Sequence, residues 1–344
     1  MQRKLDVDLL RVIATFAVIV THVCSYNWYG KEVDTFYWQS LNLYSSIFRW
    51  CVPFFVMISG IFFLDPEKII DLKRIYYKYI LRLVIILVFW TLFYAFYNSI
   101  DFLYNKDFFS YYLQSLSSSS FHLWFIVMII GLYIIVPFLR LVIERKTLSE
   151  YFIILSVIFG FFVPFLQNFA VFSFTKEITE SLHLNFVLGY SGYYVLGYYL
   201  YKYDLVKKIK ISLYYMGVLS FIFTIIASSV FSLMNGKASH LFFDYLSPNV
   251  MIMSVSLFVY LKDIFIKRDF SKSQIILISF LSRYSLGIYL IHIFYINVFA
   301  RFQFTTELFN PIFSVIIISF VVYLVSLFTI YLISKVSMIR KYII

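Results

Sequence analysis

The chain of 344 residues is far more apolar than a water-soluble protein of this size, with 62% hydrophobic residues, 14% charged residues and a mean hydropathy of +0.85. This composition excludes a soluble enzyme. The net charge of +11 does not indicate nucleic-acid binding, because the cations concentrate in loops on one side of the predicted spans. The apolar runs match the ~20 residues that a membrane-spanning helix needs. We therefore predict an all-α, polytopic integral membrane helical bundle.

Ten apolar spans are predicted, and their even number places both termini on the same side of the membrane. They cover residues 9–26, 46–64, 83–99, 121–139, 151–173, 185–201, 211–233, 248–261, 284–300 and 311–334. Most Lys and Arg residues lie in the loops on the side of the termini, which the positive-inside rule assigns to the cytoplasm. We expect residues 27–45, 99–120 and 234–247 to form outer loops, with a loop at Ser117–Ser120. Residues 1–344 are expected to form one membrane domain without an appended soluble domain.

The first span carries a polar stripe. Arg11 and His22 are eleven residues apart, which is about 20° past three helical turns, so they share one face with ~16 Å of axial rise between them. Asp8, Thr15 and Ser25 fall near the same face. Such a stripe must contact protein or water rather than lipid. It is either a ladder of hydrogen bonds that only packs the bundle, or a functional site.

Ionisable groups deep inside the predicted spans are few: Arg11, His22 and His292. Coupled transporters usually place carboxylates at mid-membrane, and the predicted spans hold none at that depth. In the ninth span Ser285, Tyr289 and His292 follow i, i+4, i+7 spacing and share a face. His292 is either a structural residue bonded to a neighbouring hydroxyl or carbonyl, or part of a functional site.

Polar and aromatic residues also gather toward the outer ends of the spans. His122 and Trp124, at the entrance of the fourth span, either contact a substrate or anchor the chain at the membrane surface. Seven tyrosines between residues 190 and 203 form an aromatic belt and packing surface, or a platform for sugars. Cys24 and Cys51 are either buried free thiols or a disulfide.

Five dispersed motifs together resemble the acyltransferase-3 family, and in sequence order they cover nearly the whole chain. They are Asp8-Leu-Leu-Arg11 followed by His22, the second-span Val52-Pro-Phe-Phe-Val-Met-Ile-Ser59-Gly60, the fourth-span His122-Leu-Trp-Phe with Gly131 and Pro137, the sixth-span Gly192-Tyr-Tyr-Val-Leu-Gly197, and the ninth-span Ser285-Leu-Gly-Ile-Tyr-Leu-Ile-His292.

The resemblance implies a ten-span acyltransferase that moves an acyl group, usually acetyl, from cytoplasmic acyl-coenzyme A to a hydroxyl of a glycan or related molecule. Arg11 and His22 match the functional pair of the family. The family often has two arginines three residues apart in the basic loop after the second span. This chain differs there, and the candidates for contact with the donor are Lys73, Arg74, Lys78 and Arg82. These cations either attract the phosphates of coenzyme A or only set the topology.

Acyl transfer to a hydroxyl needs a base or a nucleophile, and an imidazole can serve as either near neutral pH. We expect His22 in that role, with Arg11 holding the donor or neutralising charge on the thioester oxygen. The residues expected to bind the acceptor substrate are His122, Trp124, Tyr289 and His292.

The expected function is O-acetylation of a cell-envelope glycan, which can be lipid-linked, in the cell membrane. Acetyl-coenzyme A is the expected donor, and neither a metal nor nucleic acid is expected to take part. The alternative is an exporter or flippase of a glycan or lipid-linked precursor, and a polysaccharide polymerase is a weaker third possibility.

Overall fold

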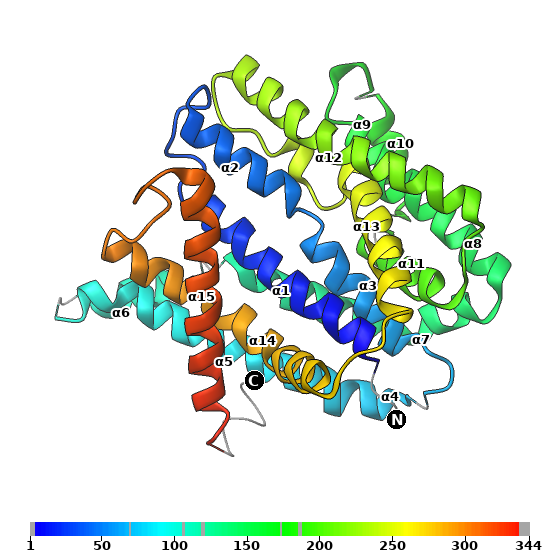
Figure 1. The fold of residues 1–344 in the computed structure, drawn as a ribbon, viewed down its shortest axis with the longest axis horizontal. Helices are drawn as coiled ribbons and strands as arrows, with labels where there is room; N and C mark the ends of the chain where they lie inside the picture. Colours follow the sequence, from blue (N-terminus) through cyan, green and yellow to red (C-terminus); the bar gives the residue numbers. More distant parts are fainter. Residues whose placement is uncertain are drawn as a thin grey trace.

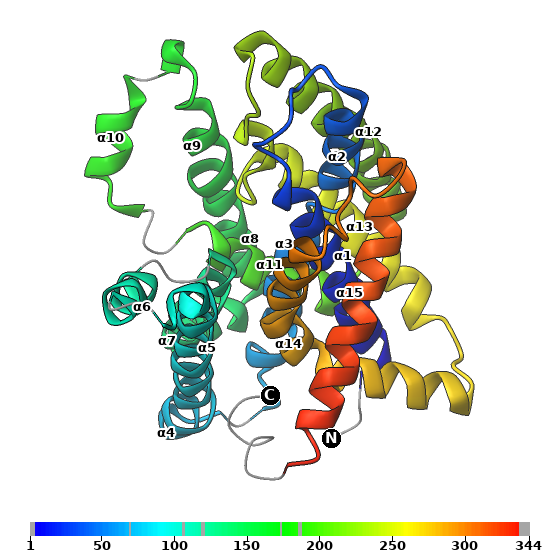
Figure 2. The same ribbon diagram turned by 90° about the vertical axis from the view of Figure 1, so that its left-hand side faces the viewer.

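The computed structural model describes residues 4–68, 70–104, 107–117, 121–172, 174–184 and 188–336, and it has no strand among them. Within these residues nine helical segments are long and apolar enough to cross a membrane. The prediction of an all-α polytopic membrane protein is therefore confirmed. Helix α1 (Leu5–Tyr26) begins, and α15 (Pro311–Ile333) ends, toward the same end of the bundle (Figure 2). We call this the inner end and the opposite one the outer end.

Helix α1 lies at the centre of the bundle (Figure 1) and packs against α14 (Lys272–Arg301), α3 (Cys51–Phe63) and α15. It runs parallel to α14, because Asp8 contacts Ser282 at the inner end and His22 contacts His292 further out. The polar stripe of α1 thus faces protein, as its cost in lipid requires.

The predicted second span, 46–64, is wrong at its outer end. Only α3 lies within the predicted span, and a separate helix, α2 (Phe36–Ile47), precedes it. Residues 36–45, expected in an outer loop, are helical because the Thr35 hydroxyl caps α2 by accepting a hydrogen bond from Trp38 N at 3.2 Å. Pro53 lies in the first turn of α3, where its missing N–H is not needed. The break at residues 48–50 places Arg49 between the two helices.

The segment predicted as the sixth span is α11 (Tyr190–Lys202), which has 13 residues and is not among the nine long helices. It still runs from the outer end, where the Tyr193 hydroxyl donates to the Tyr245 carbonyl, to the inner end, where Lys262 bonds to the Leu200 carbonyl. Nine of its residues are buried. A helix surrounded by protein does not need the length that lipid contact demands, which explains the difference from the prediction.

Two other predicted segments differ in extent. The expected outer loop 99–120 contains α6 (Phe108–Ser117), in which apolar residues recur with helical period, while Ser118–Ser120 lie outside the described residues. The predicted span 151–173 is instead α8 (Lys146–Leu155), a π-helical segment (Ser156–Phe162) and the short α9 (Val163–Leu166). Further helices of the bundle are α5 (Leu81–Ser99), α7 (Trp124–Glu144), α10 (Thr175–Ser181), α12 (Lys207–Asn235) and α13 (Pro248–Ile266).

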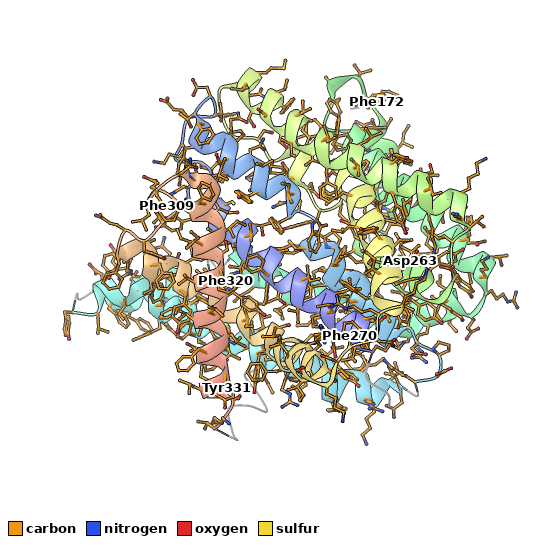
Figure 3. All side chains as sticks on the ribbon, in the orientation of Figure 1. Phe172, Asp263, Phe270, Phe309, Phe320 and Tyr331 are labelled. Atoms are coloured by element: carbon orange, nitrogen blue, oxygen red, sulfur yellow. The ribbon has the colours of Figure 1, made fainter. Side chains whose placement is uncertain are left out.

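Side chains fill the spaces between the helices (Figure 3). Large apolar side chains such as Phe320 on α15 are exposed on the outside of the bundle, where lipid would contact them. Cys24 and Cys51 are free and buried, so the alternative of a disulfide between them is wrong.

Candidate active site

Two histidines from distant parts of the chain meet in the outer half of the bundle. His22 Nδ1 on α1 lies 2.6 Å from His292 Nε2 on α14, and the two rings are nearly parallel, with 13° between their planes. His292 is fully buried, whereas His22 is partly exposed. The parallel packing of α1 and α14 therefore joins the two predicted polar stripes.

Hydrogen bonding decides which nitrogen of His22 is available. His292 Nδ1 lies 2.5 Å from the backbone carbonyl of Tyr289, and a carbonyl only accepts, so Nδ1 carries the hydrogen. Nε2 of neutral His292 then accepts a hydrogen bond from His22 Nδ1. His22 is left with a bare Nε2, to which no described residue hydrogen-bonds. This nitrogen can take a proton or attack an acyl carbon.

A third histidine, His122, lies in the 3-10 helix Phe121–Leu123, directly before α7, and its ring contacts the pair. It is fully buried, which rules out the alternative that it anchors the chain at the membrane surface. Its ring packs edge-on against His292, with centroids 5.6 Å apart, and its Nε2 lies 3.4 Å from the Leu290 carbonyl. Its Nδ1 has no hydrogen-bond partner among the described residues. The three imidazoles do not form a metal-binding group in the described part of the chain.

Tyr289, expected to bind substrate, links α14 to the segment that precedes α7. It is buried, and its hydroxyl donates to the backbone carbonyl of His122. Tyr94 on α5, which the sequence reasoning did not single out, donates to the Leu290 carbonyl at 2.7 Å. These two bonds fix the helix turn that carries His292. Trp124 lies at the outer rim and is 37% exposed, so it remains accessible to a substrate.

Arg11 lies at the inner end of the same stripe. Its Nη1 is 3.2 Å from Ser282 Oγ and 3.4 Å from Asp8 Oδ1, and the Ser282 hydroxyl also donates to Asp8 at 2.6 Å. The guanidinium lies over the ring of Phe62, 5.2 Å from its centroid. Arg11 is therefore held in a fixed position and its charge is partly balanced by Asp8, a partner that the sequence reasoning had not assigned.

The four basic candidates are exposed on a segment that leads toward Arg11. Lys73 and Arg74 belong to α4 (Leu72–Arg74), Lys78 to a π-helical segment (Ile75–Ile80), and Arg82 to the first turn of α5.

Arg82 is linked to Arg11 through one tyrosine, because the charges of both arginines interact with the Tyr133 hydroxyl. Tyr133 packs with Phe63 and Tyr79 in an aromatic cluster, with ring centroids 4.2 Å apart for Phe63 and Tyr133. The contact of these basic residues with the donor stays a prediction.

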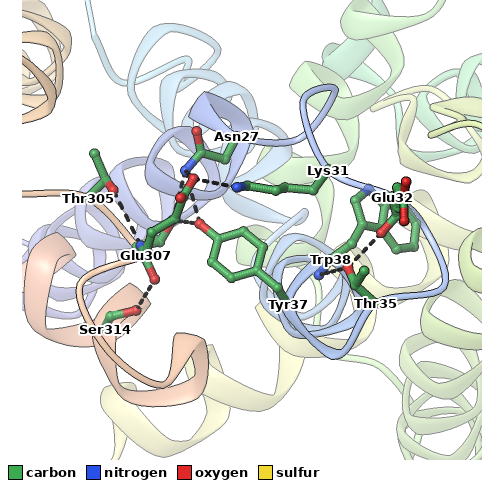
Figure 4. Close-up of polar contacts among 10 residues, drawn as sticks. Asn27, Lys31, Glu32, Thr35, Tyr37, Trp38, Thr305, Glu307 and Ser314 are labelled. Atoms are coloured by element: carbon green, nitrogen blue, oxygen red, sulfur yellow. Dashed lines mark hydrogen bonds and ion pairs between the residues drawn. The ribbon is translucent and has the colours of Figure 1, made fainter. Parts of the chain in front are cut away.

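Polar contacts tie the outer end of α1 to the segment before α15 (Figure 4). Lys31 Nζ lies 2.8 Å from Glu307 Oε1, and Asn27 donates to the same carboxylate and to the Tyr37 hydroxyl, each at 3.0 Å. The bond with Glu307 raises the pKa of Lys31. This network closes the outer end of the α1–α14 pair.

Sequence reasoning did not single out Tyr94, Tyr133 or Arg49 as candidate residues. Arg49 could have been noticed, because a cation on the outer side departs from the positive-inside rule. The two tyrosines carry no such signal, since 31 tyrosines occur in the chain.

A polytopic helical bundle with a histidine pair in its outer half, and a fixed arginine at the inner end of the same helix, has the features of a membrane transferase. The model of the acyltransferase domain family Acyl_transf_3 matches residues 4–333. The chain belongs to this family, and it is a multi-pass membrane acyltransferase. Comparisons with curated proteins and with solved structures found no match.

Proposed function

We propose that this protein is an O-acyltransferase of the cell membrane that moves an acetyl group from cytoplasmic acetyl-coenzyme A to a hydroxyl of a cell-envelope glycan. The observation that carries the proposal is the 2.6 Å contact of His22 Nδ1 with His292 Nε2, from which a bare Nε2 of His22 follows, on the helix that carries Arg11 at its inner end. The helix offers a proton acceptor toward one side of the membrane and a cation toward the other.

In the overall reaction the C–S bond of the thioester breaks, an ester C–O bond to the acceptor forms, and the hydroxyl proton ends on the released thiol. His22 Nε2 takes this proton as the acceptor oxygen attacks the acyl carbon, and then gives it to the leaving sulfur. Donation from Nδ1 to His292 stabilises the imidazolium between these steps. If His22 carries the acyl group covalently, the same nitrogen is the nucleophile.

The residues at the inner end fit an anionic donor such as coenzyme A. Lys73, Arg74, Lys78 and Arg82 are exposed there, and cations attract phosphates and hold them by charge-assisted hydrogen bonds. Arg11 lies further in, where its positive charge can hold an anionic part of the donor.

Incubation of the purified protein with radiolabelled acetyl-coenzyme A and fractionated cell-envelope glycans tests the proposal. We expect label in the glycan as a base-labile ester, together with release of an equal amount of coenzyme A thiol. An exporter would leave the glycan unlabelled, and a polymerase would lengthen it without label. Either of these results would refute the proposal.

A further inference from the structure

We propose that the acceptor binds beside His22 in a site formed by Arg49, Trp124, Tyr190 and Tyr245, and that it is a sugar bearing a negatively charged group. This inference rests on the proposed function, since it names the class of acceptor. The charged group is a carboxylate or a phosphate, because a guanidinium binds both through the same hydrogen bonds.

Arg49 lies in the break between α2 and α3, toward the outer end. Its Nε donates to the Phe243 carbonyl, and its Cζ lies 4.2 Å from the centroid of the Tyr245 ring. The side chain is partly buried. The Cys51 sulfur, two residues further along the chain, lies 4.0 Å from the hydroxyl of Thr21, the residue before His22. Burial, together with the charge of Arg49, lowers the pKa of His240 in the neighbouring loop. The guanidinium is thus positioned close to the reactive imidazole.

No carboxylate forms an ion pair with Arg49 among the residues that the structure describes. Three other described cations toward the outer end are paired: Lys31 with Glu307, Arg301 with Asp101 at 2.9 Å, and Lys176 with Glu180 at 4.0 Å. Lys237 is exposed to water, unlike Arg49. A partly buried guanidinium without a carboxylate partner is costly to maintain, since charges removed from water are normally paired. An anionic ligand would supply the missing charge.

An aromatic wall continues from Arg49. The ring of Trp124 lies nearly parallel to that of Tyr245, with 26° between the planes and centroids 5.9 Å apart. The centroid of the Tyr190 ring lies 5.8 Å from that of Trp124. Flat aromatic faces suit the apolar face of a sugar ring. A pocket of about 450 Å³ adjoins this wall, and its lining includes Gly189 and Asp244, the direct chain neighbours of Tyr190 and Tyr245. Asp244 can accept hydrogen bonds from sugar hydroxyls there.

The test uses glycans extracted from the envelope of the source cells, separated by charge, with radiolabelled acetyl-coenzyme A as donor. The anionic fraction is offered untreated, after reduction of its carboxyl groups, and after removal of its phosphates, so that the two sources of charge are distinguished. We expect the label in the untreated anionic fraction, and one of the two treatments to raise the acceptor KM by roughly tenfold or more.

Arg49→Gln should raise the KM for the untreated anionic acceptor by about as much as removal of the charged group does. With the neutralised acceptor, the variant and the wild type should have similar KM values. The donor KM should not change. Arg49→Lys, which keeps the charge, should be milder, and Lys237→Gln, which removes an exposed cation of the outer loop, should match the wild type.

Three results would overturn the inference while leaving the proposed function intact: label only in neutral glycans, Arg49→Gln with wild-type kinetics on the anionic fraction, or an equal loss on charged and neutralised acceptors. The last result would instead assign Arg49 to stabilisation of charge at the reacting group. Absence of label in every fraction would refute the proposed function, and this inference with it.

Discussion

Tyr289 lies one turn before His292 on α14, and its backbone carbonyl accepts the Nδ1 hydrogen of His292. Because the acceptor is backbone, no side-chain substitution removes it. The orientation of His292 is thereby set by the helix itself, and the tautomer of His22 follows from it. We therefore propose that His292 positions His22.

Replacement of His292 tests this role. In His292→Gln the side-chain amide can still donate to the Tyr289 carbonyl and accept from His22 Nδ1, so we expect a substantial part of the activity to remain. His292→Leu removes the acceptor and should lower kcat by roughly 10–100-fold, as is typical for the loss of an orienting partner. Acyl transfer measured at matched protein levels checks this order. Equal losses in the two variants would contradict the positioning role.

We expect Arg11 to have both a structural and a functional role, and a double substitution separates its effect on stability from its effect on transfer. Arg11→Gln removes a cation that contacts the buried carboxylate of Asp8, and we expect about 1–3 kcal/mol of lost stability as well as lost transfer. Asp8→Asn added to Arg11→Gln removes the charge of the carboxylate as well and should restore thermal stability, measured in detergent, without restoring activity. Recovery of transfer together with stability would show that Arg11 acts only in packing.

At the scale of helices, α3 and α11 approach each other through glycines. A Cβ atom added at Gly60 would lie 1.9 Å from the Tyr194 carbonyl oxygen, and one at Gly197 would lie 2.4 Å from the backbone of Met57. Small residues at such positions allow helix backbones to pack closely in membranes. This contact holds the short α11 in place.

We expect Gly60→Ala to separate the two helices and to cost roughly 1–3 kcal/mol or more, seen as a lower unfolding temperature in detergent. Gly131→Ala is the matched control, because a Cβ there meets no atom within 4 Å. The control should be neutral or slightly stabilising, since alanine favours a helix over glycine by about 1 kcal/mol. If both variants lost the same stability, close packing at Gly60 would not be the cause.

Helical periodicity was sufficient to place Arg11 and His22 on one face, because that relation depends on spacing within a single helix. The pairing of His22 with His292 was beyond the sequence, since it depends on the register of two helices that are 270 residues apart in the chain. The break at residues 48–50 was also missed, because the apolar run continues through it. The burial of His122 was left open for a similar reason, as its surroundings come from α5 and α14.

At the scale of the whole molecule, the mechanism depends on orientation, with the basic segment in the cytoplasm and the histidine pair toward the outside. Lys207 and Lys237 lie at or just beyond opposite ends of α12, which makes them a matched pair of reporters. On a background lacking Cys24 and Cys51, an impermeant thiol reagent applied to intact cells should label Lys237→Cys and not Lys207→Cys. Labelling of Lys207→Cys alone would show that the topology is the reverse of the one proposed.

The central claim is that His22 performs the proton transfer or carries the acyl group, and His22→Gln tests it most directly. Glutamine keeps hydrogen-bonding capacity but cannot exchange a proton near neutral pH. With radiolabelled acetyl-coenzyme A and envelope glycans, at matched expression and with His183→Gln as the control, we expect His22→Gln to lower transfer by roughly 10²–10⁴-fold. The control should retain wild-type activity, because His183 is exposed and belongs to neither the histidine pair nor the proposed acceptor site. Near-normal transfer by His22→Gln would contradict the account.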